Sequence, residues 1–375
     1  MRLPRHSAPQ LPTIAGGVAL QNILPDYMHS EFVNIRDRVK PPNLWEHPLP
    51  RACHRLSKSD EVDFLLRLRE VGMGDFVPES DLYVRDRLGR LVLPVGGFFA
   101  VAHKQDSDRL IYDRRPANAI MRPFKFRARL PHSSSFTKLI IEPSQTVRGS
   151  MDDLRCMFYC LQQPPQGELL NGVGRRWTGR QIGLQHLGRH VNYRFALRVQ
   201  GIGDLSAVDI AQHTHESILQ THGCLEPAHH LHFDETVPAS HTWEGVYIDD
   251  KCVCQVLPRA DLANTSLDYH DAVLVERGEA AYEATHCLEQ VTEKRLRLSE
   301  SIVAWGTAVQ GRVGRVAAPD SKCALTCACL AAAISKGKID KKSFEQILGS
   351  LIHPFQHRTE LMCILSDSYV FVHGI

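Results

Sequence analysis

Residues 243–253 read Trp-Glu-Gly-Val-Tyr-Ile-Asp-Asp-Lys-Cys-Val, and the fold assignment starts from them. Apolar Val246 and Ile248 alternate into Asp249-Asp250, and the apolar pattern resumes at Val253. Alternation with a period of two is typical of β-strands, and Asp is common in tight turns because its side chain caps the turn backbone. The sequence therefore predicts a hairpin over residues 241–257 with two carboxylates at its tip.

Two carboxylates at a hairpin tip have two interpretations. They can form an ordinary turn, or they can form half of a site for Mg²⁺, which prefers oxygen ligands. Phosphoryl transfer with two metal ions needs carboxylates from at least two converging segments, because the attacking and leaving oxygens must be held in line. The tip alone leaves both interpretations open.

The segments around the hairpin resemble, in their order, the polymerase motifs of reverse transcriptases. The run Tyr247-Ile-Asp-Asp250 is similar to the third motif of that family. Upstream, the run Asp153-Leu-Arg-Cys-Met-Phe-Tyr159 resembles the first motif, in which an Asp is followed five residues later by an aromatic residue. The resemblance implies that Asp153, Asp249 and Asp250 are catalytic and hold two Mg²⁺ ions, with Mn²⁺ as an alternative ion.

The first motif also implies a choice among neighbouring residues. By the resemblance, Phe158 is a steric gate that would clash with a ribose 2′-hydroxyl, which predicts a preference for deoxynucleotides. Asp152 is the competing metal ligand, but it would place Met157 at the gate, so Asp153 is preferred. Plain core packing is the alternative role of Phe158.

A Gln-Gly step lies between these two motifs. Gln200-Gly201, ahead of a predicted helix over residues 207–219, resembles the family motif that contacts the incoming nucleotide and the template. The sequence departs from that motif, because Val199 stands where proline is usual and residues 203–205, Gly-Asp-Leu, lengthen the turn. A buried glycine turn ahead of a helix is the alternative interpretation.

Basic residues flank the predicted nucleotide site. Residues 109–118, Arg-Leu-Ile-Tyr-Asp-Arg-Arg-Pro-Ala-Asn, resemble the fingers segment of the family. Cationic side chains can clamp a triphosphate through charged hydrogen bonds, so Arg109 and Lys104 are predicted to contact the phosphates. Tyr247 of the hairpin is a further predicted nucleotide contact. Ordinary surface charge is the alternative for both cations.

Downstream segments continue the same order. Residues 282–294 resemble the fourth motif, in which Lys294 would protonate the leaving pyrophosphate. Trp305-Gly306 resembles the turn that supports the primer strand. Four lysines beyond it would follow the phosphates of the duplex. These are Lys336, Lys338, Lys341 and Lys342.

The predicted fold is α+β, a right-hand polymerase with an antiparallel palm sheet, fingers and a helical thumb. Its parts are an extended lead-in over 1–58, an N-terminal region with fingers over 59–145, a palm over 146–310 and a thumb over 311–375. Periodicity and turn signals predict helices at 59–71, 207–219, 272–298, 320–335, 341–351 and 356–367. They predict strands at 92–102, 110–112, 139–142, 241–257 and 302–317, and a Gly- and Arg-rich loop with a hairpin character at 166–190.

The charge distribution suits a protein that binds a polyanion. The net charge is only +2, but residues 85–129 carry eleven Lys or Arg against four acids, and residues 175–198 carry six Arg and no acid. Residues 226–283 reverse the balance, with twelve acids against three bases. Basic segments on either side of an acidic one favour nucleic acid at the edges and cations at the centre. Each run by itself is also common on a solvated face.

Composition narrows the class of protein. The chain has 375 residues, 43% hydrophobic and 23% charged, which is typical of a globular protein with more than one core. No run reaches the roughly 18 to 20 apolar residues of a membrane span, and the first ten residues lack a secretion signal. We expect an intracellular protein of the cytoplasm or nucleus, without membrane partners. The eleven cysteines are expected to be reduced, and no zinc site is expected at Cys252 and Cys254.

The resemblance implies an RNA-directed DNA polymerase of a retroelement, a nucleotidyltransferase that extends a primer on an RNA or DNA template with deoxynucleoside triphosphates. A catalytically inactive nucleic-acid-binding remnant is the first alternative. An RNA-dependent RNA polymerase, which the aromatic Phe158 disfavours, is the second. No ribonuclease H, protease or integrase signature accompanies the motifs, so we expect such segments of a polyprotein to be missing from this chain.

Overall fold

The computed structural model describes residues 11–104, 107–184, 186–233, 235–262, 269–287 and 295–373. These residues fold into helices and sheets that form two compact units. Unit 1 takes its residues from 1–128, 154–222 and 279–291, and unit 2 takes its residues from 129–153, 223–278 and 292–375. Helix α8 (His270–Ala284) contributes residues to both units. The predicted boundaries of fingers, palm and thumb stay predictions.

Unit 1 contains an antiparallel sheet of order β2-β10-β9 and an antiparallel hairpin of β5 and β6. Its strands are β1 (Val18–Ala19), β2 (Gly74–Pro78), β3 (Val84–Arg85), β4 (Leu91–Val92), β5 (Gly97–Lys104), β6 (Ser107–Asp113), β8 (Leu161–Gln162), β9 (Gly172–Thr178) and β10 (Asn192–Leu197). Its helices, besides part of α8, are α1 (Leu20–Ile23), α2 (Asp26–Val33), α3 (Lys58–Glu70), α4 (Arg115–Ile120), α5 (Met157–Cys160), α6 (Gly179–Ile182) and α7 (Ala207–Gln220).

The helices predicted at 59–71 and 207–219 are confirmed as α3 and α7. Helix α3 begins where the Ser57 hydroxyl accepts a hydrogen bond from the Asp60 amide at 3.2 Å, which satisfies a free N–H of the first turn. Leu65 and Leu68 of α3 are buried in the main core of this unit together with Phe98 of β5 and Phe195 of β10. The helix, the hairpin and the sheet of unit 1 therefore share one core.

Two predictions for unit 1 are wrong. Residues 1–58 were expected to be extended, but β1, α1 and α2 form between residues 18 and 33, and β1 pairs in parallel with β8. Leu20, Met28 and Phe32 are at most 1% exposed, and they recur at helical spacings of eight and four residues. Pro25 divides this apolar pattern between two short helices, so the pattern is not sustained. Residues 166–190 were expected to form a loop with a hairpin character. The antiparallel pairing of β9 with β10 agrees with the hairpin, but the loop is wrong, because these residues contain strand β9 and helix α6.

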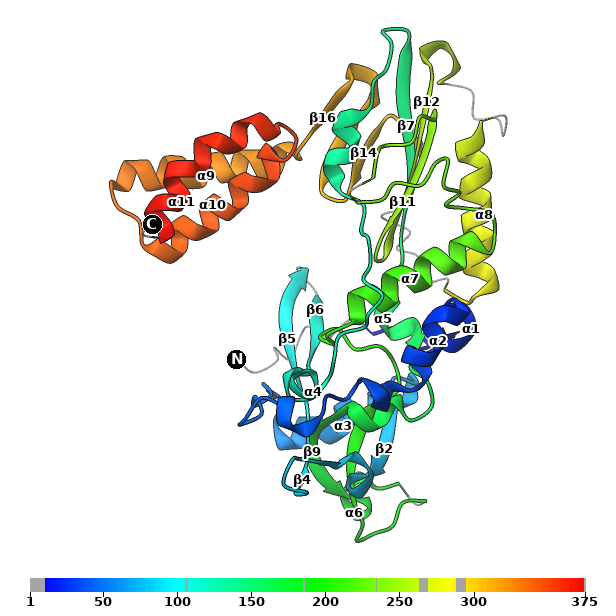
Figure 1. Ribbon diagram of the computed structural model, residues 1–375, viewed down its shortest axis with the longest axis vertical. Helices are drawn as coiled ribbons and strands as arrows, with labels where there is room; N and C mark the ends of the chain where they lie inside the picture. The colour runs from blue at the N-terminus through cyan, green and yellow to red at the C-terminus, as the bar shows by residue number, and fades with distance from the viewer. Residues whose placement is uncertain are drawn as a thin grey trace. The chain divides into compact units, whose positions relative to one another are not determined.

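Unit 2 contains an antiparallel sheet of order β11-β12-β7-β13 with helix α8 beside it (Figure 1). A second antiparallel sheet has the order β14-β15-β16. The strands are β7 (Gln145–Asp153), β11 (Thr242–Tyr247), β12 (Asp250–Pro258), β13 (Leu296–Ser299), β14 (Ser301–Ala304), β15 (Thr307–Gln310) and β16 (Arg315–Ala317). A buried ion pair at 2.7 Å between Arg148 of β7 and Asp271 of α8 fixes the helix to the sheet.

The strands predicted at 241–257 and 302–317 are confirmed, whereas two other predictions for unit 2 are wrong. Residues 139–142 form no strand, because the neighbouring β7 already pairs with β12 and β13. The helix predicted at 272–298 ends at Ala284, and residues 296–299 form strand β13 on the sheet edge instead. The helical stretch predicted at 356–367 is confirmed, as a 3₁₀ helix, Thr359–Leu365, followed by α11 (Ser366–His373).

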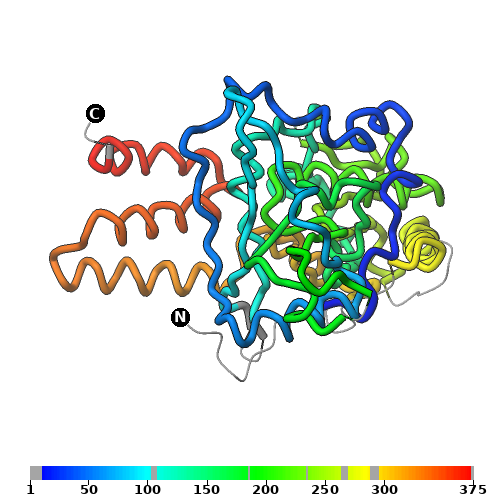
Figure 2. The backbone as a smooth tube through the Cα atoms, turned by 90° about the horizontal axis from the view of Figure 1, so that it is seen from below, coloured from blue at the N-terminus to red at the C-terminus, as the bar shows by residue number. Residues whose placement is uncertain are grey.

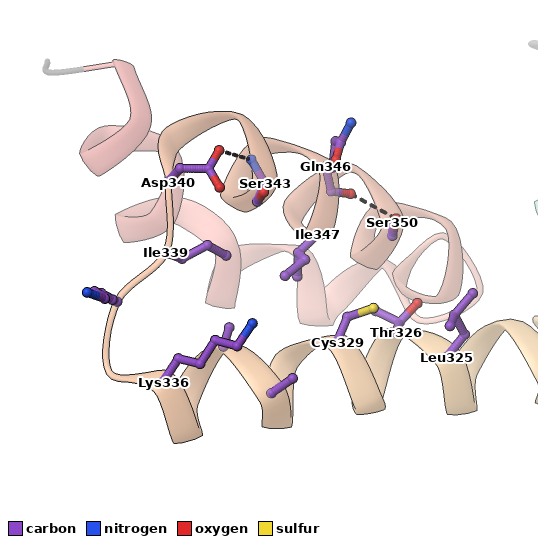
Figure 3. A pocket seen from close by; sticks show the side chains of 13 residues that line it. Leu325, Thr326, Cys329, Lys336, Ile339, Asp340, Ser343, Gln346, Ile347 and Ser350 are labelled. Carbon is purple, nitrogen blue, oxygen red and sulfur yellow. Dashed lines mark hydrogen bonds between the residues drawn. The ribbon is translucent and has the colours of Figure 1, made fainter.

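The C-terminal helices α9 (Asp320–Lys336) and α10 (Lys341–Phe355) confirm the other two predicted helices and run side by side in opposite directions (Figure 2). A small core joins α10 with the segments that follow it and consists of Leu348, Leu365 and Val372. Helix α9 contributes no residue to this core. A groove of about 740 Å³ lies between α9 and α10, and Cys329 and Ile347 face each other across it (Figure 3). Among the described residues, no helix is long and apolar enough to cross a membrane.

Candidate active site

The register of the predicted hairpin places Asp249 in its turn and Asp250 at the start of its second strand. β11 pairs with β12, and Tyr247 lies opposite Asp250, so Ile248 and Asp249 form the two-residue turn. Ile248 has a φ angle of 59°, in the left-handed region that β-branched residues rarely adopt. A residue held in such a region costs roughly 1–3 kcal/mol. The surrounding sheet must therefore enforce the shape of this turn.

Asp153 lies directly beside the turn. β7 pairs with β12 in antiparallel register, and Asp153 is the cross-strand partner of Asp250. Side chains directly opposite each other in an antiparallel pair point to the same face, with Cβ atoms about 4.5–5.5 Å apart. The carboxylates of Asp153 and Asp250 therefore share one face at the end of the sheet, next to the turn with Asp249. Two adjacent strands supply the converging carboxylates that two-ion chemistry requires.

Asp152 belongs to the opposite face of the sheet. Side chains alternate along a strand, so Asp152 shares its face with Lys251, its own cross-strand partner. Its carboxylate lies 2.6 Å from the Arg297 guanidinium, which also donates a hydrogen bond to the Met151 carbonyl at 2.9 Å. Asp152 is thus held in a buried ion pair. This geometry favours Asp153 over Asp152 as a candidate metal ligand.

A buried polar cluster lies on that opposite face. The Lys251 ammonium is 3.8 Å from the Glu244 carboxylate, and the two side chains are 1% and 0% exposed. The ammonium donates hydrogen bonds to the Leu274 carbonyl of α8 at 2.9 Å and to the Cys224 thiol at 3.5 Å. Burial raises the pKa of Glu244, and the nearby ammonium opposes this shift. Lys251 therefore ties the strand that starts with Asp250 to helix α8.

Gly278 makes room for this cluster. A Cβ atom at that position would lie 2.5 Å from the Lys251 ammonium nitrogen. A glycine within a helix costs about 1 kcal/mol relative to alanine. Glycine is nevertheless favoured at position 278, because a larger residue would displace the Lys251 side chain, which approaches the helix closely.

Trp305 and Gly306, the predicted primer support, form the turn between β14 and β15. Ala304 pairs with Thr307, and both turn residues have positive φ angles, 49° and 82°. The Trp305 ring stacks on Phe136 with centroids 5.3 Å apart, and it also lies over Gly245 of β11. The turn is therefore packed on the same hairpin that carries Asp249 and Asp250.

The Gln-Gly step lies in unit 1, where both residues are tightly packed. Gln200 is 0% exposed and its side-chain oxygen accepts a hydrogen bond from Gln163. Gly201 packs against Tyr112, because a Cβ atom there would lie 2.5 Å from the Tyr112 ring. The structure thus gives Gln200 a buried side-chain partner, and its contact with a nucleotide stays a prediction.

The lengthened turn after this step has its own partners. Asp204 is 3.0 Å from Arg114, and both side chains are at most 4% exposed. Gly203 has a φ of 125°, and a Cβ atom there would lie 2.0 Å from the Tyr112 carbonyl oxygen. The residues that lengthen this turn are therefore held by contacts with Arg114 and Tyr112. The ion pair with Asp204 also removes Arg114 from the set of cations that could face a triphosphate.

The other predicted residues are spread over the two units or lie outside the described residues. Arg109 is exposed on β6, and Lys104 is the last residue of β5. Phe158 is half-buried in α5 and packs against the core of unit 1, which agrees with its alternative role. Tyr247 is 36% exposed at the end of β11. Lys294 lies outside the described residues.

Structural comparison relates this arrangement to known proteins. A foamy viral protease-reverse transcriptase in complex with double-stranded DNA matches 93% of this chain with a TM-score of 0.50 and 12% sequence identity. The fold resembles that of a viral reverse transcriptase. The chain spans 54% of that viral polypeptide. A foamy viral protease-reverse transcriptase bound to an RNA/DNA hybrid covers 88% of the chain and 38% of its own length, with a TM-score of 0.47 and 12% identity. Neither a protein-family model nor a curated protein matches the sequence.

The sequence analysis missed Lys251 and Glu244. Both are charged residues at positions of a period-two pattern whose neighbours, Val246, Cys252 and Val253, are apolar. A lysine inside an apolar strand is rarely buried without a partner. In the predicted antiparallel hairpin, Lys251 lies on the same face as Glu244 of the other strand. This arrangement could have predicted a buried ion pair from the sequence.

Proposed function

We propose that this chain is an RNA-directed DNA polymerase, a nucleotidyltransferase of the reverse transcriptase type from a retroelement. The observation that carries the proposal is the pairing of Asp153 with Asp250 beside the turn that holds Asp249. The fold resemblance supports the same assignment. In this proposal the four-stranded sheet of unit 2 belongs to the palm, α9 to α11 to the thumb and the β5–β6 hairpin to the fingers.

In this proposal, the residues at the end of the sheet hold two divalent ions. Asp153 and Asp250 present hard carboxylate oxygens on one face, and Asp249 adds a third carboxylate from the turn. Two Mg²⁺ ions, or Mn²⁺ in their place, would stabilise the charge of phosphoryl transfer and hold the reacting oxygens in line. The protein contributes the fixed spacing of these ligands. Arg297 keeps Asp152 on the other face, so that the ligand set stays defined.

The substrate contacts in this proposal are those that the resemblance to reverse transcriptases implies. Arg109 and Lys104 bind the triphosphate, Tyr247, Gln200 and Gly201 contact the nucleotide, and Lys294 protonates the pyrophosphate. Trp305 and Gly306 support the primer strand on an RNA or DNA template. The packing of Trp305 on Phe136 and against β11 gives the primer contact a fixed position relative to the aspartates.

An inactive remnant that still binds nucleic acid is the second candidate. The observation that favours it is the complete burial of Gln200 against Gln163, next to a turn that departs from the family motif. A nucleotide contact through this side chain would require a local rearrangement.

Primer extension on an RNA template tests the proposal. We expect the intact protein with Mg²⁺ and deoxynucleotides to extend a primer, and the Asp249→Asn, Asp250→Asn double variant to lose this activity. The turn and the sheet keep their hydrogen bonds in that variant, so its melting temperature serves as the control for folding. Absence of extension by both proteins, together with salt-sensitive template binding, would favour the inactive remnant.

Phe158→Ala tests the proposed gate. We expect the ratio of ribonucleotide to deoxynucleotide incorporation to rise at least tenfold, which corresponds to about 1.4 kcal/mol of discrimination. Because Phe158 also packs against the core of unit 1, Phe158→Tyr, which keeps the ring, is the matched control. An unchanged ratio with a lowered melting temperature would leave Phe158 as a packing residue only.

A further inference from the structure

A polar pocket of about 430 Å³ lies in unit 2, away from the strands that carry the aspartates. Four of its lining residues lie in or next to the 3₁₀ helix Ser133–Lys138, and four lie in the segment that precedes β11. They are His132, Ser134, Ser135 and Lys138, and His232, Phe233, Glu235 and Thr236. Its volume is within the range of about 300–1,000 Å³ that small-molecule sites occupy. The residues that line it have no role in the proposed catalysis.

The lining offers many hydrogen-bond donors and a positive charge. Ser135 and Thr236 contribute hydroxyl groups, whereas the Ser134 hydroxyl lies 2.7 Å from Nδ1 of His132. Lys138 is exposed and makes no ion pair with the residues that the structure describes. The carboxylate of Glu235 is neutralised by Arg129, whose guanidinium lies 2.6 Å away. A phosphate group, which accepts several hydrogen bonds and carries negative charge, suits this set of donors.

His132 adds a donor without adding charge. Burial and the neighbouring His357 lower the pKa of His132, so the imidazole is neutral at pH 7. Its Nδ1 accepts a hydrogen bond from the Ser134 amide at 3.3 Å, which assigns the ring proton to Nε2. The pocket therefore binds through neutral donors and a single ammonium group.

An exposed aromatic ring lies at the same pocket. Phe233 is 47% exposed, although it is a large apolar side chain, and its ring meets His132 edge to face with centroids 6.1 Å apart. A ring that leaves one face open beside cationic and hydroxyl groups suits a nucleobase, because stacking on an aromatic side chain contributes about 1–3 kcal/mol per base.

The 3₁₀ helix also connects the pocket with the turn of Trp305. Phe136, in the same short helix as Ser134 and Lys138, is 2% exposed and stacks on the Trp305 ring. One helix thus supports the predicted primer turn with one side chain and lines the pocket with others. A strand that follows the turn would pass close to the pocket.

We propose that this pocket binds one nucleotide unit of a single-stranded nucleic acid. The phosphate contacts Lys138 and the hydroxyl groups of Ser135 and Thr236, and the base stacks on Phe233. That the nucleotide belongs to a nucleic-acid strand rests on the proposed function, because the Trp305 turn is the proposed primer support. That the ligand is a nucleotide rests on the residues that line the pocket. A free nucleotide has the same chemistry, so the experiment separates the two sources.

Fluorescence anisotropy of a labelled oligothymidylate measures the binding. We expect Phe233→Ala to weaken binding about 5- to 100-fold. We expect Lys138→Ala to weaken it several-fold and to reduce the slope of log affinity against log salt by about 1. Phe371→Ala, which removes a 78% exposed ring from α11, and Lys58→Ala in α3 are the matched controls and should bind as the wild type does.

Each outcome decides the proposal. Affinity that is unchanged in both pocket variants, or no binding by the wild type, would overturn it. Competition by thymidine monophosphate at concentrations near the Kd of the oligothymidylate would assign the pocket to a free nucleotide. It would overturn the proposal that the pocket binds a nucleic-acid strand. Weakened binding in Phe233→Ala, combined with absent primer extension by the wild type, would overturn the polymerase proposal but keep the pocket.

Discussion

Asp153→Asn should reduce primer extension by at least about 10²- to 10³-fold, on the scale of losing one preorganised electrostatic group. Asp152→Asn, one residue earlier in the same strand, should retain most of the activity. The reason is the alternation along β7, which gives Asp153 the face of Asp250 and gives Asp152 the face of Lys251. The measurement is the single-turnover extension rate at saturating Mg²⁺.

The two variants should also differ in stability, in the opposite order. Asp153→Asn removes one of several neighbouring negative charges, so its free energy of unfolding should stay the same or rise. Asp152→Asn removes the charged partner of Arg297 and should lower the free energy of unfolding by about 1–3 kcal/mol. Equal losses of activity in both variants, after correction for the folded fraction, would contradict the assignment of Asp153.

Lys251→Met should lower the free energy of unfolding by about 3–5 kcal/mol, because it leaves Glu244 buried without its cation. Adding Glu244→Gln should recover most of this loss, since the pair is then replaced by neutral groups. Urea denaturation of the two variants and the wild type measures the difference. A double variant no more stable than Lys251→Met would show that the packing of the lysine, and not its charge, matters.

The Lys251→Met variant should also depend on pH. Burial already raises the pKa of Glu244, and removal of the ammonium raises it further. The Glu244 carboxyl then keeps its proton in the folded state, whereas in the unfolded state it releases the proton above a pKa of about 4.3. The free energy of unfolding therefore falls as pH rises from the unfolded-state pKa to the raised folded-state pKa of Glu244. The loss relative to the wild type should therefore be larger at pH 8 than at pH 5.5. The double variant, which lacks the carboxylate, should not show this difference.

The hairpin was predictable from sequence because it depends on local patterns. Alternation of apolar residues around Asp249-Asp250 gives both the strands and the position of the turn. The helices over 59–71 and 207–219 were predictable for the same reason, since a cap at Ser57 or a sustained helical period marks them locally. The polymerase assignment came from the order of the motifs, and the fold resemblance agrees with it at that level.

The rest of the site depends on contacts between distant segments. Nothing local in the sequence around Asp152 indicates that Arg297 holds it, and nothing around Gln200 indicates that Gln163 covers it. The N-terminal segment was wrongly expected to be extended because its helical apolar pattern is short and Pro25 interrupts it. Helix α8 ends earlier than its pattern predicted, because the following residues pair with the edge of the sheet. Such contacts follow from tertiary packing and not from propensity.

The pairing of Asp153 with Asp250 also constrains when the site can form. The two residues are about 100 positions apart in the sequence, so their strands meet only after a long loop has closed, which is a slow class of event in folding. The left-handed backbone of Ile248 destabilises the turn, so we expect the hairpin not to form stably before β7 pairs with it. During synthesis, β7 leaves the ribosome well before β12 exists. We therefore expect the carboxylate cluster to be among the last features to mature, and incomplete chains to lack any metal-dependent chemistry.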